Sequence, residues 1–463
     1  MMFSPETYQK RREQLKKLMG TGVLLFPGNN ETPMNYPANP YHFRQDSSFL
    51  YYFGIDEPGL TGIIDVDNDS EVLFGDDVAM EDIIWTGPLP GLAEKAKKVN
   101  ISDTRPVSRL REVIGQYTDN DRPVLYLPQY RQDIINMVGD LTGTEHSEVN
   151  KSSSEKLARA VISQRSIKSG QEIAEIEKAL DISWEMNRTA MKLIRDGAYE
   201  YEVCGRVQAS VLARNSHLSF PIIFSIHGET LHNHSHDNMM SEGDIVIMDS
   251  GAESPLHYAS DITRTIPVSG EFSERQKFIY ETVLRAQLDA IDMMKPGVRN
   301  LDCHLKAAET MASGLIEIGL MKGDTGEAVA AGAHALFFPH GLGHMLGLDV
   351  HDMEGLNEDL VGYDENIKRS DQFGLAYLRL ARELEPGFVV TVEPGIYFIP
   401  ELIDRWKEDD KFTEFINYDE VEKYRKFGGI RIEDDVLITE SGHRVLGNPI
   451  AKTVEDVEEW CAG

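Results

Sequence analysis

The sequence predicts an α+β protein of two domains, in which an N-terminal α/β domain precedes a domain with helices packed on a curved, mainly antiparallel sheet. The 463 residues exceed what one ordinary hydrophobic core organises. Helix and strand signals alternate through the first third of the chain. Long amphipathic helices and widely separated strand signals fill the remainder, which is the pattern of an α+β domain.

The composition excludes several classes of protein. A hydrophobic content of 41% with 8% aromatic residues is that of a globular chain. The net charge of −31 argues against nucleic acid or an anionic membrane as a partner. Three widely spaced cysteines indicate neither a disulfide framework nor a zinc knuckle. With no apolar signal sequence and no window of about 18 apolar residues, we expect a cytoplasmic protein.

The first domain begins with an expected amphipathic helix, for which Ser4 is the N-cap and Pro5 the first helical residue. Apolar runs bounded by glycine, proline or asparagine then predict four strands, at 22–26, 61–66, 71–74 and 124–127. This region contains few candidate catalytic groups.

A polar stretch over 148–170 marks the expected boundary, which we place so that the domains span 1–165 and 166–463. Directly after it, Ser169 and Glu172 have the spacing of a capping box and predict the start of a long helix. Three long helices are expected in the second domain, at 169–196, 273–295 and 301–318.

Four strand signals follow in the second domain, at 245–248, 262–266, 388–392 and 430–438. Asp249 ends the first of these strands, and Asp261 opens the second after a loop of eleven residues. If the two strands form a hairpin, both carboxylates lie at its loop end. Acids so close repel each other unless a positive charge lies between them. The alternative is that both merely terminate strands, as aspartate often does at turns.

A glycine-rich segment, PHGLGHMLGLDVH, contains His340, His344 and His351. Its glycines disfavour a regular helix and predict a loop with close backbone approach, where functional histidines are often held. A chance cluster on a surface loop is the alternative. Five further histidines lie upstream, most of them interpreted as surface or supporting residues: His217, His227, His232, His234 and His236.

Two glutamates end or occupy apolar strands in the same domain. Glu393 follows a buried run, and Pro394 and Gly395 then turn the chain away. Alternation puts Arg431 and Glu433 on one face of their strand. A carboxylate on a buried face needs a cation, which either Arg431 or a metal could supply.

Four carboxylates and one imidazole would nearly neutralise a pair of divalent metal ions. Oxygen-rich ligands favour Mn²⁺, with Co²⁺, Zn²⁺ or Fe²⁺ as alternatives. Such a pair lowers the pKa of a bridging water, and a nearby histidine can stabilise the oxyanion formed when the resulting hydroxide attacks a carbonyl. The expected chemistry is hydrolysis of an amide or an ester.

Five stretches occur in the order seen in the pita-bread metallopeptidases, the family of prolidase and aminopeptidase P, and the resemblance covers almost the whole chain. YHFRQDSSFLYYFGIDEPG resembles the N-terminal domain of those two enzymes. The others lie in the second domain: DSGAESPLHYASDITRTIPVSG, FFPHGLGHMLGLDVHD, LEPGFVVTVEPGIYF and FGGIRIEDDVLIT. The resemblance implies a pita-bread catalytic domain and a peptidase that cleaves before proline.

The resemblance also implies a ligand set. Asp249 would hold one metal, Asp261 and Glu433 would bridge both, and His344 and Glu393 would complete the second. Glu393 would also carry the proton to the leaving proline nitrogen. The remaining catalytic residues implied are His232, His340 and His351, of which His351 stabilises the tetrahedral intermediate and His340 supports the pocket. His234 remains an alternative to His232.

Three residues are implied in substrate binding: Arg379, Arg431 and Trp85. Arg379 occupies the place of the prolidase arginine that binds the carboxylate of a dipeptide, although without the resemblance it reads as a solvated helix residue. Trp85 resembles a tryptophan offered by a neighbouring subunit, which implies a homodimer or larger assembly.

We therefore expect an Xaa-Pro dipeptidase (prolidase). An Xaa-Pro aminopeptidase acting on longer peptides is the alternative. A non-catalytic binding protein of the same fold and a metal-independent, creatinase-like enzyme are disfavoured, because all five ligands are present.

Overall fold

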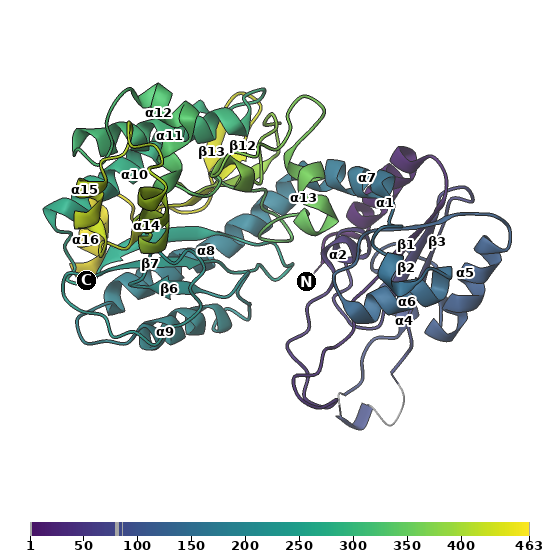
Figure 1. Ribbon diagram of the computed structural model, residues 1–463. Coiled ribbons are helices and arrows are strands. Elements are labelled where there is room, and N and C mark those ends of the chain that lie inside the picture. The colour runs from purple at the N-terminus through teal and green to yellow at the C-terminus, as the bar shows by residue number, and fades with distance from the viewer. Residues whose placement is uncertain (1, 79–82, 86, 463) are drawn as a thin grey trace. The chain divides into compact units, whose positions relative to one another are not determined.

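The computed structural model describes residues 2–78, 83–85 and 87–462. The chain divides into two compact units, described separately here (Figure 1). The first comprises Met1–Arg165 together with Met353–Leu360, and the second comprises Ser166–Asp352 together with Val361–Gly463.

The first unit contains a mixed five-stranded sheet of order β4-β3-β2-β1-β5, in which β1 pairs antiparallel with β2 and parallel with β5. The strands are β1 Val23–Pro27, β2 Thr61–Asp65, β3 Ser70–Phe74, β4 Asp103–Arg105 and β5 Val124–Tyr126. The described helices are α1 Pro5–Met19, α2 Ser47–Phe53, α4 Leu92–Lys97, η1 Val107–Arg109, α5 Leu110–Thr118, α6 Gln132–Thr142, η2 His146–Glu148 and α7 Glu155–Ser166. The four strands and the first helix expected from the sequence are present.

One hydrophobic core cluster of this unit lies between its sheet and the helices α5 and α6. Val23, Leu25 and Ile63 from the strands pack with Ile114 of α5 and Val138 of α6 in one buried cluster. Alternate residues of a strand point to the same face of a sheet, which is why these strand positions share one cluster.

The second unit contains three long helices at the expected places, α8 Gly170–Leu193, α10 Glu274–Met293 and α11 Asn300–Glu317 (Figure 1). The capping box at Ser169 is formed, because its side chain accepts from the N–H of Glu172 while the Glu172 carboxylate accepts from the N–H of Ser169. The other helices of this unit are α9 Glu200–Leu212, α12 Thr325–Ala331, η3 Ala333–Leu336, η4 Leu375–Tyr377, α14 Pro400–Glu408, α15 Tyr418–Val421, η5 Glu422–Tyr424 and α16 Val454–Ala462. The helix α13 Glu354–Gly362 lies mostly in the segment Met353–Leu360, which belongs to the first unit.

Three antiparallel sheets of the second unit have the orders β6-β7-β8, β13-β12-β9 and β10-β11. Their strands are β6 Ile223–Ser225, β7 Ile245–Ser250, β8 Ile262–Pro267, β9 Val389–Val392, β10 Gly395–Tyr397, β11 Gly429–Arg431, β12 Asp434–Ile438 and β13 His443–Val445.

The single strand expected at 430–438 is wrong in one respect, because it is interrupted at Ile432 and Glu433 and divides into β11 and β12. β11 pairs with β10, whereas β12 pairs with β9 and β13. At the interruption, the Glu433 N–H donates instead to the carbonyl of Thr263 in β8. The apolar alternation of Ile430 and Ile432 ends at Asp434, so the three successive acids at 433–435 are a local signal of the break that the expectation of one strand overlooked.

The composition indicated no disulfide framework and no membrane-spanning segment. Cys204, Cys303 and Cys461 form no disulfide. Among the described residues, no helix has the length and apolarity needed to cross a lipid bilayer.

Candidate metal centre

Strand ends and loops of the second unit enclose a cavity of about 400 Å³. Many of its lining residues are polar and come from strands and loops far apart in the sequence. The polar side chains that line it are His232, His234, Asp249, Asp261, His340, His344, His351, Arg379, Glu393, Arg431 and Glu433.

The first two acids come from the β7–β8 hairpin. In its antiparallel register Asp249 lies opposite Thr263, and Asp261 comes directly before β8, so both carboxylates lie at the loop end. The Asp261 N–H donates to Oδ2 of the buried Asp435 at 3.1 Å, which fixes the start of β8. The hairpin expected from the sequence is therefore formed.

The histidine segment runs beside β9 without forming a helix or strand. Main-chain bonds join the two, since the Thr391 N–H donates to the His344 carbonyl and the Glu393 N–H to the Leu342 carbonyl. A Cβ at Gly343 would lie 2.0 Å from the Thr391 carbonyl oxygen. Only glycine permits this approach, which brings His344 beside Glu393.

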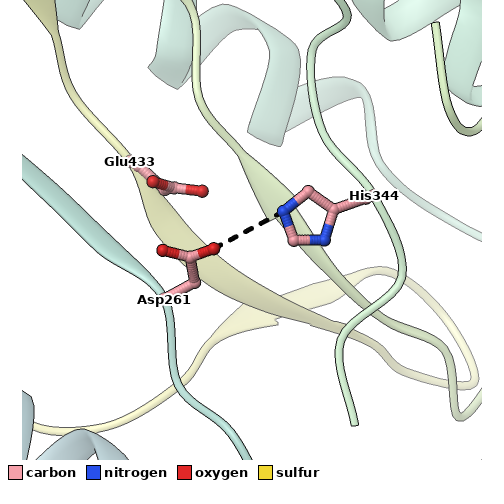
Figure 2. Close-up of side chains that lie close together, drawn as sticks. All are labelled: Asp261, His344 and Glu433. Carbon is pink, nitrogen blue, oxygen red and sulfur yellow. Dashed lines mark ion pairs between the residues drawn. The ribbon is translucent and has the colours of Figure 1, made fainter. Parts of the chain in front are cut away.

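In its neutral form, His344 presents an unprotonated nitrogen to the acids. Its Nδ1 lies 3.0 Å from the Met345 carbonyl, which can only accept, so Nδ1 carries the proton. Nε2 then faces Asp261 Oδ2 at 3.5 Å and Glu393 Oε1 at 3.9 Å, the first contact being drawn in Figure 2. This is the tautomer that a metal-binding imidazole requires.

The acids and His344 fit a cation. Asp261, His344 and Glu433 each offer a ligand atom within 4.8 Å of the other two (Figure 2). Asp249, Asp261 and Glu433 each have one buried carboxylate oxygen with no hydrogen-bond partner among the described residues. Burial, followed by repulsion from neighbouring carboxylates, raises the pKa of Asp261 and of Glu433 well above the usual range. Such a cluster is stable in its charged form only with positive charge between the acids, which divalent ions supply.

Glu393 directly follows β9 and lines the same cavity. Burial raises the pKa of Glu393 to about 7, against the opposing effects of His344, Arg431 and Arg379. The carboxylate is thus close to three positively charged or protonatable groups and to His344 Nε2.

Arg431 holds several of these acids in place. Its Nη2 donates to Asp249 Oδ2 at 2.7 Å, its Nη1 to the Tyr397 hydroxyl at 2.9 Å and its Nε to the Thr263 hydroxyl at 3.2 Å. Thr263 in turn donates to Glu433 Oε2 at 2.7 Å. Arg431 is therefore a buried partner of the acid cluster as well as part of the cavity wall.

Sequence reasoning missed Tyr397 and Thr263. The signal for Thr263 was its alternation in the same strand as Asp261, which puts both on one face. Tyr397 had no comparable signal, because its link to Arg431 spans 34 residues.

Two catalytic histidine candidates, His340 and His351, flank the acids. His340 Nδ1 donates to the Gly341 carbonyl at 2.8 Å, so its Nε2 accepts from the Tyr397 hydroxyl at 2.8 Å. Burial lowers the pKa of His340 to about 3 and keeps its ring neutral. The His351 ring centroid lies 4.1 Å from that of His344.

His232 and His234 both line the cavity, so the choice between them stays open. Burial lowers the pKa of His232, and the positive charge of Arg431 adds to this effect. His232 is therefore neutral at neutral pH and able to donate or accept a hydrogen bond.

The two remaining substrate-binding candidates differ in location. Arg379 follows η4 in a loop and lines the cavity, so it is not the solvated helix residue of the alternative interpretation. Trp85 belongs to the first unit, where 86% of it is exposed. It does not line this cavity.

Comparison with known proteins shows similarity along the whole chain. Residues 174–440 match the family model of metallopeptidase family M24, and residues 8–126 match that of the aminopeptidase P N-terminal domain. Human Xaa-Pro dipeptidase is 32% identical over 98% of this chain and 92% of its own length. A probable Xaa-Pro aminopeptidase of Pyricularia oryzae is 31% identical over 94% of this chain and 92% of its own length.

Solved structures agree with the sequence comparisons. A zinc-substituted aminopeptidase P of Escherichia coli, in complex with product, has a TM-score of 0.82 and 28% identity. The alignment covers 100% of this chain and 99% of that one.

Proposed function

Because this chain belongs to metallopeptidase family M24 and is an Xaa-Pro peptidase that acts on proline-containing peptides, we propose that its preferred substrates are Xaa-Pro dipeptides. The observation that carries this proposal is Arg379, whose guanidinium belongs to the same cavity as the acid cluster. A fixed guanidinium binds a carboxylate through two parallel hydrogen bonds, and only a dipeptide places a carboxylate directly after the proline.

The enzyme takes divalent metal ions, and we propose five ligands for a pair of them: Asp249, Asp261, His344, Glu393 and Glu433. The family resemblance implies that Asp261 and Glu433 would serve both ions, and each has one buried oxygen without a hydrogen-bond partner among the described residues. Mn²⁺ suits this oxygen-rich set best. When bound, the metal pair lowers the pKa of a water molecule and polarises the scissile carbonyl.

The protein groups around this pair have separate tasks. Glu393, beside His344, accepts a proton and returns it to the leaving proline nitrogen. His351 and His232 hydrogen-bond the oxygen of the scissile carbonyl as negative charge develops there. His340 forms a neutral, fixed wall of the pocket through its bonds to Gly341 and Tyr397.

An Xaa-Pro aminopeptidase remains the second candidate, because relatives of that name match nearly as well and the structural neighbour is an aminopeptidase P. The Arg379→Ala variant distinguishes the two. If Arg379 binds the dipeptide carboxylate, kcat/KM for Ala-Pro falls by about tenfold or more, the worth of one lost charged contact, and kcat/KM for Ala-Pro-Ala changes far less. Equal losses on both substrates would contradict the proposed role.

The first unit, within residues 1–165, is proposed to be the aminopeptidase P-like domain, and 166–463 the catalytic domain. The exposed indole of Trp85 is suited to burial against another subunit. We propose that it reaches the cavity of a second copy in a homodimer. A cytoplasmic location stays a prediction from the sequence.

A further inference from the structure

The backbone beside Arg379 is held by a clamp formed by the half-buried Arg369 and the buried Tyr363. Arg369 Nη1 donates to the carbonyls of Ala376 and Leu378, at 3.0 Å each. The Tyr363 hydroxyl donates to the same Leu378 carbonyl at 2.6 Å. The Arg369 guanidinium carbon lies 4.7 Å from the centroid of the Tyr363 ring, so the two clamp residues also brace each other.

Close backbone contacts fix the same stretch from two other directions. A Cβ at Gly341 would lie 3.0 Å from the Leu378 Cα, and a Cβ at Gly362 would lie 1.8 Å from the Arg379 carbonyl oxygen. The Gly362 carbonyl accepts from the N–H of Ala381 at 2.9 Å. The chain therefore passes Arg379 with no room to shift toward either glycine.

The residues around Arg379 are also packed. Tyr363, Ile367, Leu378 and Ala381 form a small hydrophobic cluster of their own under the loop. On the far side of Arg379, the Leu380 carbonyl accepts from the Asn300 side chain at 3.0 Å. Arg379 is thus the one cavity-lining residue in a run, 378–381, whose other members are buried.

An arginine side chain binds a carboxylate less tightly if its own backbone can move. Two parallel hydrogen bonds to a carboxylate require the guanidinium in one place, and each immobilised side chain costs conformational entropy on binding. A clamp that immobilises the backbone in advance removes part of that cost.

We propose that Arg369 is a positioning residue that sets the preference of this enzyme for substrates ending in a free carboxylate. The inference rests on the proposed role of Arg379. Arg369 itself does not line the cavity, so it acts only through the loop that carries Arg379.

The test compares Ala-Pro with its C-terminal amide, which has the same proline and no carboxylate. In the metal-loaded Arg369→Met enzyme, we expect KM for Ala-Pro to rise about tenfold, with kcat changed less than about twofold, because the lost hydrogen bonds involve a charged donor. Kinetics on the amide should match wild type. Arg382→Met, which removes a guanidinium paired with Glu385 outside the clamp, is the matched control and should leave both substrates unchanged.

Two further variants guard against a folding defect. Tyr363→Phe removes one hydroxyl donor and keeps the ring, and should raise KM for Ala-Pro by about threefold. Arg369→Lys keeps a cationic donor and should restore part of the Ala-Pro affinity. If all clamp variants lose activity equally on the acid and the amide, Arg369 is merely structural and the inference is overturned.

A double variant separates this inference from the proposed function. If Arg369 acts through Arg379, adding Arg369→Met to Arg379→Ala causes no further loss on Ala-Pro. If Arg379→Ala impairs Ala-Pro selectively but Arg369→Met does not, the clamp is refuted and the dipeptidase proposal stands. If Arg379→Ala lowers activity equally on Ala-Pro and on its amide, Arg379 does not bind the substrate carboxylate and the proposed function is refuted.

Discussion

The proton position on each histidine determines its use in the cavity. His344 and His340 both donate from Nδ1 to a neighbouring backbone carbonyl, at 3.0 Å and 2.8 Å. The other ring nitrogen of His344, Nε2, then faces carboxylates, whereas Nε2 of His340 accepts a hydrogen bond from the Tyr397 hydroxyl. One backbone arrangement thus prepares one imidazole as a ligand and the other as a fixed wall.

Removing either group of the proposed second metal position should abolish catalysis. We expect Glu393→Gln and His344→Ala to lower Mn²⁺-dependent hydrolysis of Ala-Pro by more than about a hundredfold, since even outer partners of metal ligands cost about 10- to 100-fold. Circular dichroism should show an intact fold. His146→Ala, at an exposed histidine of the first unit, is the control. Substantial activity in either purified variant would refute the ligand assignment.

The sequence allowed the prediction of acids at strand ends and histidines on a glycine-rich loop, because both signals are local. The division of roles among them came from the family resemblance. The supporting groups could not be predicted, since their partners are distant in sequence. Thr263 and Glu433 are 170 residues apart, and Arg431 and Asp249 are 182 apart.

The order of the second unit's elements could be predicted from the capping box at Ser169 and the strand signals, but the pairing of the strands could not. The interruption at Ile432 and Glu433 depends on which neighbours β11 and β12 find, namely β10 and β9. The three acids at 433–435 mark where the alternation of apolar residues ends, but they do not determine the strands with which β11 and β12 pair. The break matters for the site, because it lets Glu433 bond to β8 through Thr263.

A buried ion pair joins the start of the α8 segment to the end of the histidine segment. Lys168 Nζ donates to Asp352 Oδ2 at 2.8 Å, and both side chains are 1% exposed. Asp352 directly follows His351. The pair therefore fixes the chain next to a proposed catalytic histidine.

Lys168→Met should destabilise the protein by about 3 kcal/mol, because the Asp352 carboxylate loses its ion-pair partner in a buried place. Denaturant unfolding measures the change. Lys178→Met removes a lysine that pairs with Glu175 and is about half exposed, and should cost less than about 1 kcal/mol. Equal effects of the two variants would show that burial of the Lys168 pair has no energetic consequence.

At the scale of the whole molecule, two buried histidines link stability to pH. Burial, then the charges of His334 and His340, lowers the pKa of His304 to about 3, and burial lowers that of His334 to about 4. Neither ring nitrogen of His304 has a hydrogen-bond partner in the described part of the chain. Below pH about 6.5 the two histidines therefore bind protons in the unfolded chain but stay neutral in the folded protein until the pH approaches their lowered pKa values.

The sign follows from these lowered values. The two neutral histidines contribute fully to the free energy of unfolding above pH about 6.5, the pKa of histidine in the unfolded chain. This contribution is lost as the pH falls from about 6.5 toward 4, by about 1.4 kcal/mol per pH unit for each histidine. Urea unfolding of metal-free protein at pH 7 and pH 5 measures the slope. Replacing both histidines by leucine should flatten it relative to wild type. An unchanged slope would show that other groups account for the acid sensitivity.

Length and the alternation of helix and strand signals were enough to predict the class of fold and its long helices. They did not predict that Met353–Leu360 groups with the first unit, 188 residues after that unit's main segment ends at Arg165. Such a return depends on tertiary packing, for which a single sequence has no local signal. The comparisons supplied what periodicity could not, namely the family and its proline-directed activity.

The most direct test is the ratio of kcat/KM for Ala-Pro to that for Ala-Pro-Ala, measured on the wild-type protein in Mn²⁺ buffer and repeated after chelation. A dipeptidase whose Arg379 binds the terminal carboxylate should favour Ala-Pro by about tenfold or more, and lose activity on both peptides when the metal is removed. A preference for Ala-Pro-Ala would identify an aminopeptidase. Full activity after chelation would contradict the metal centre itself.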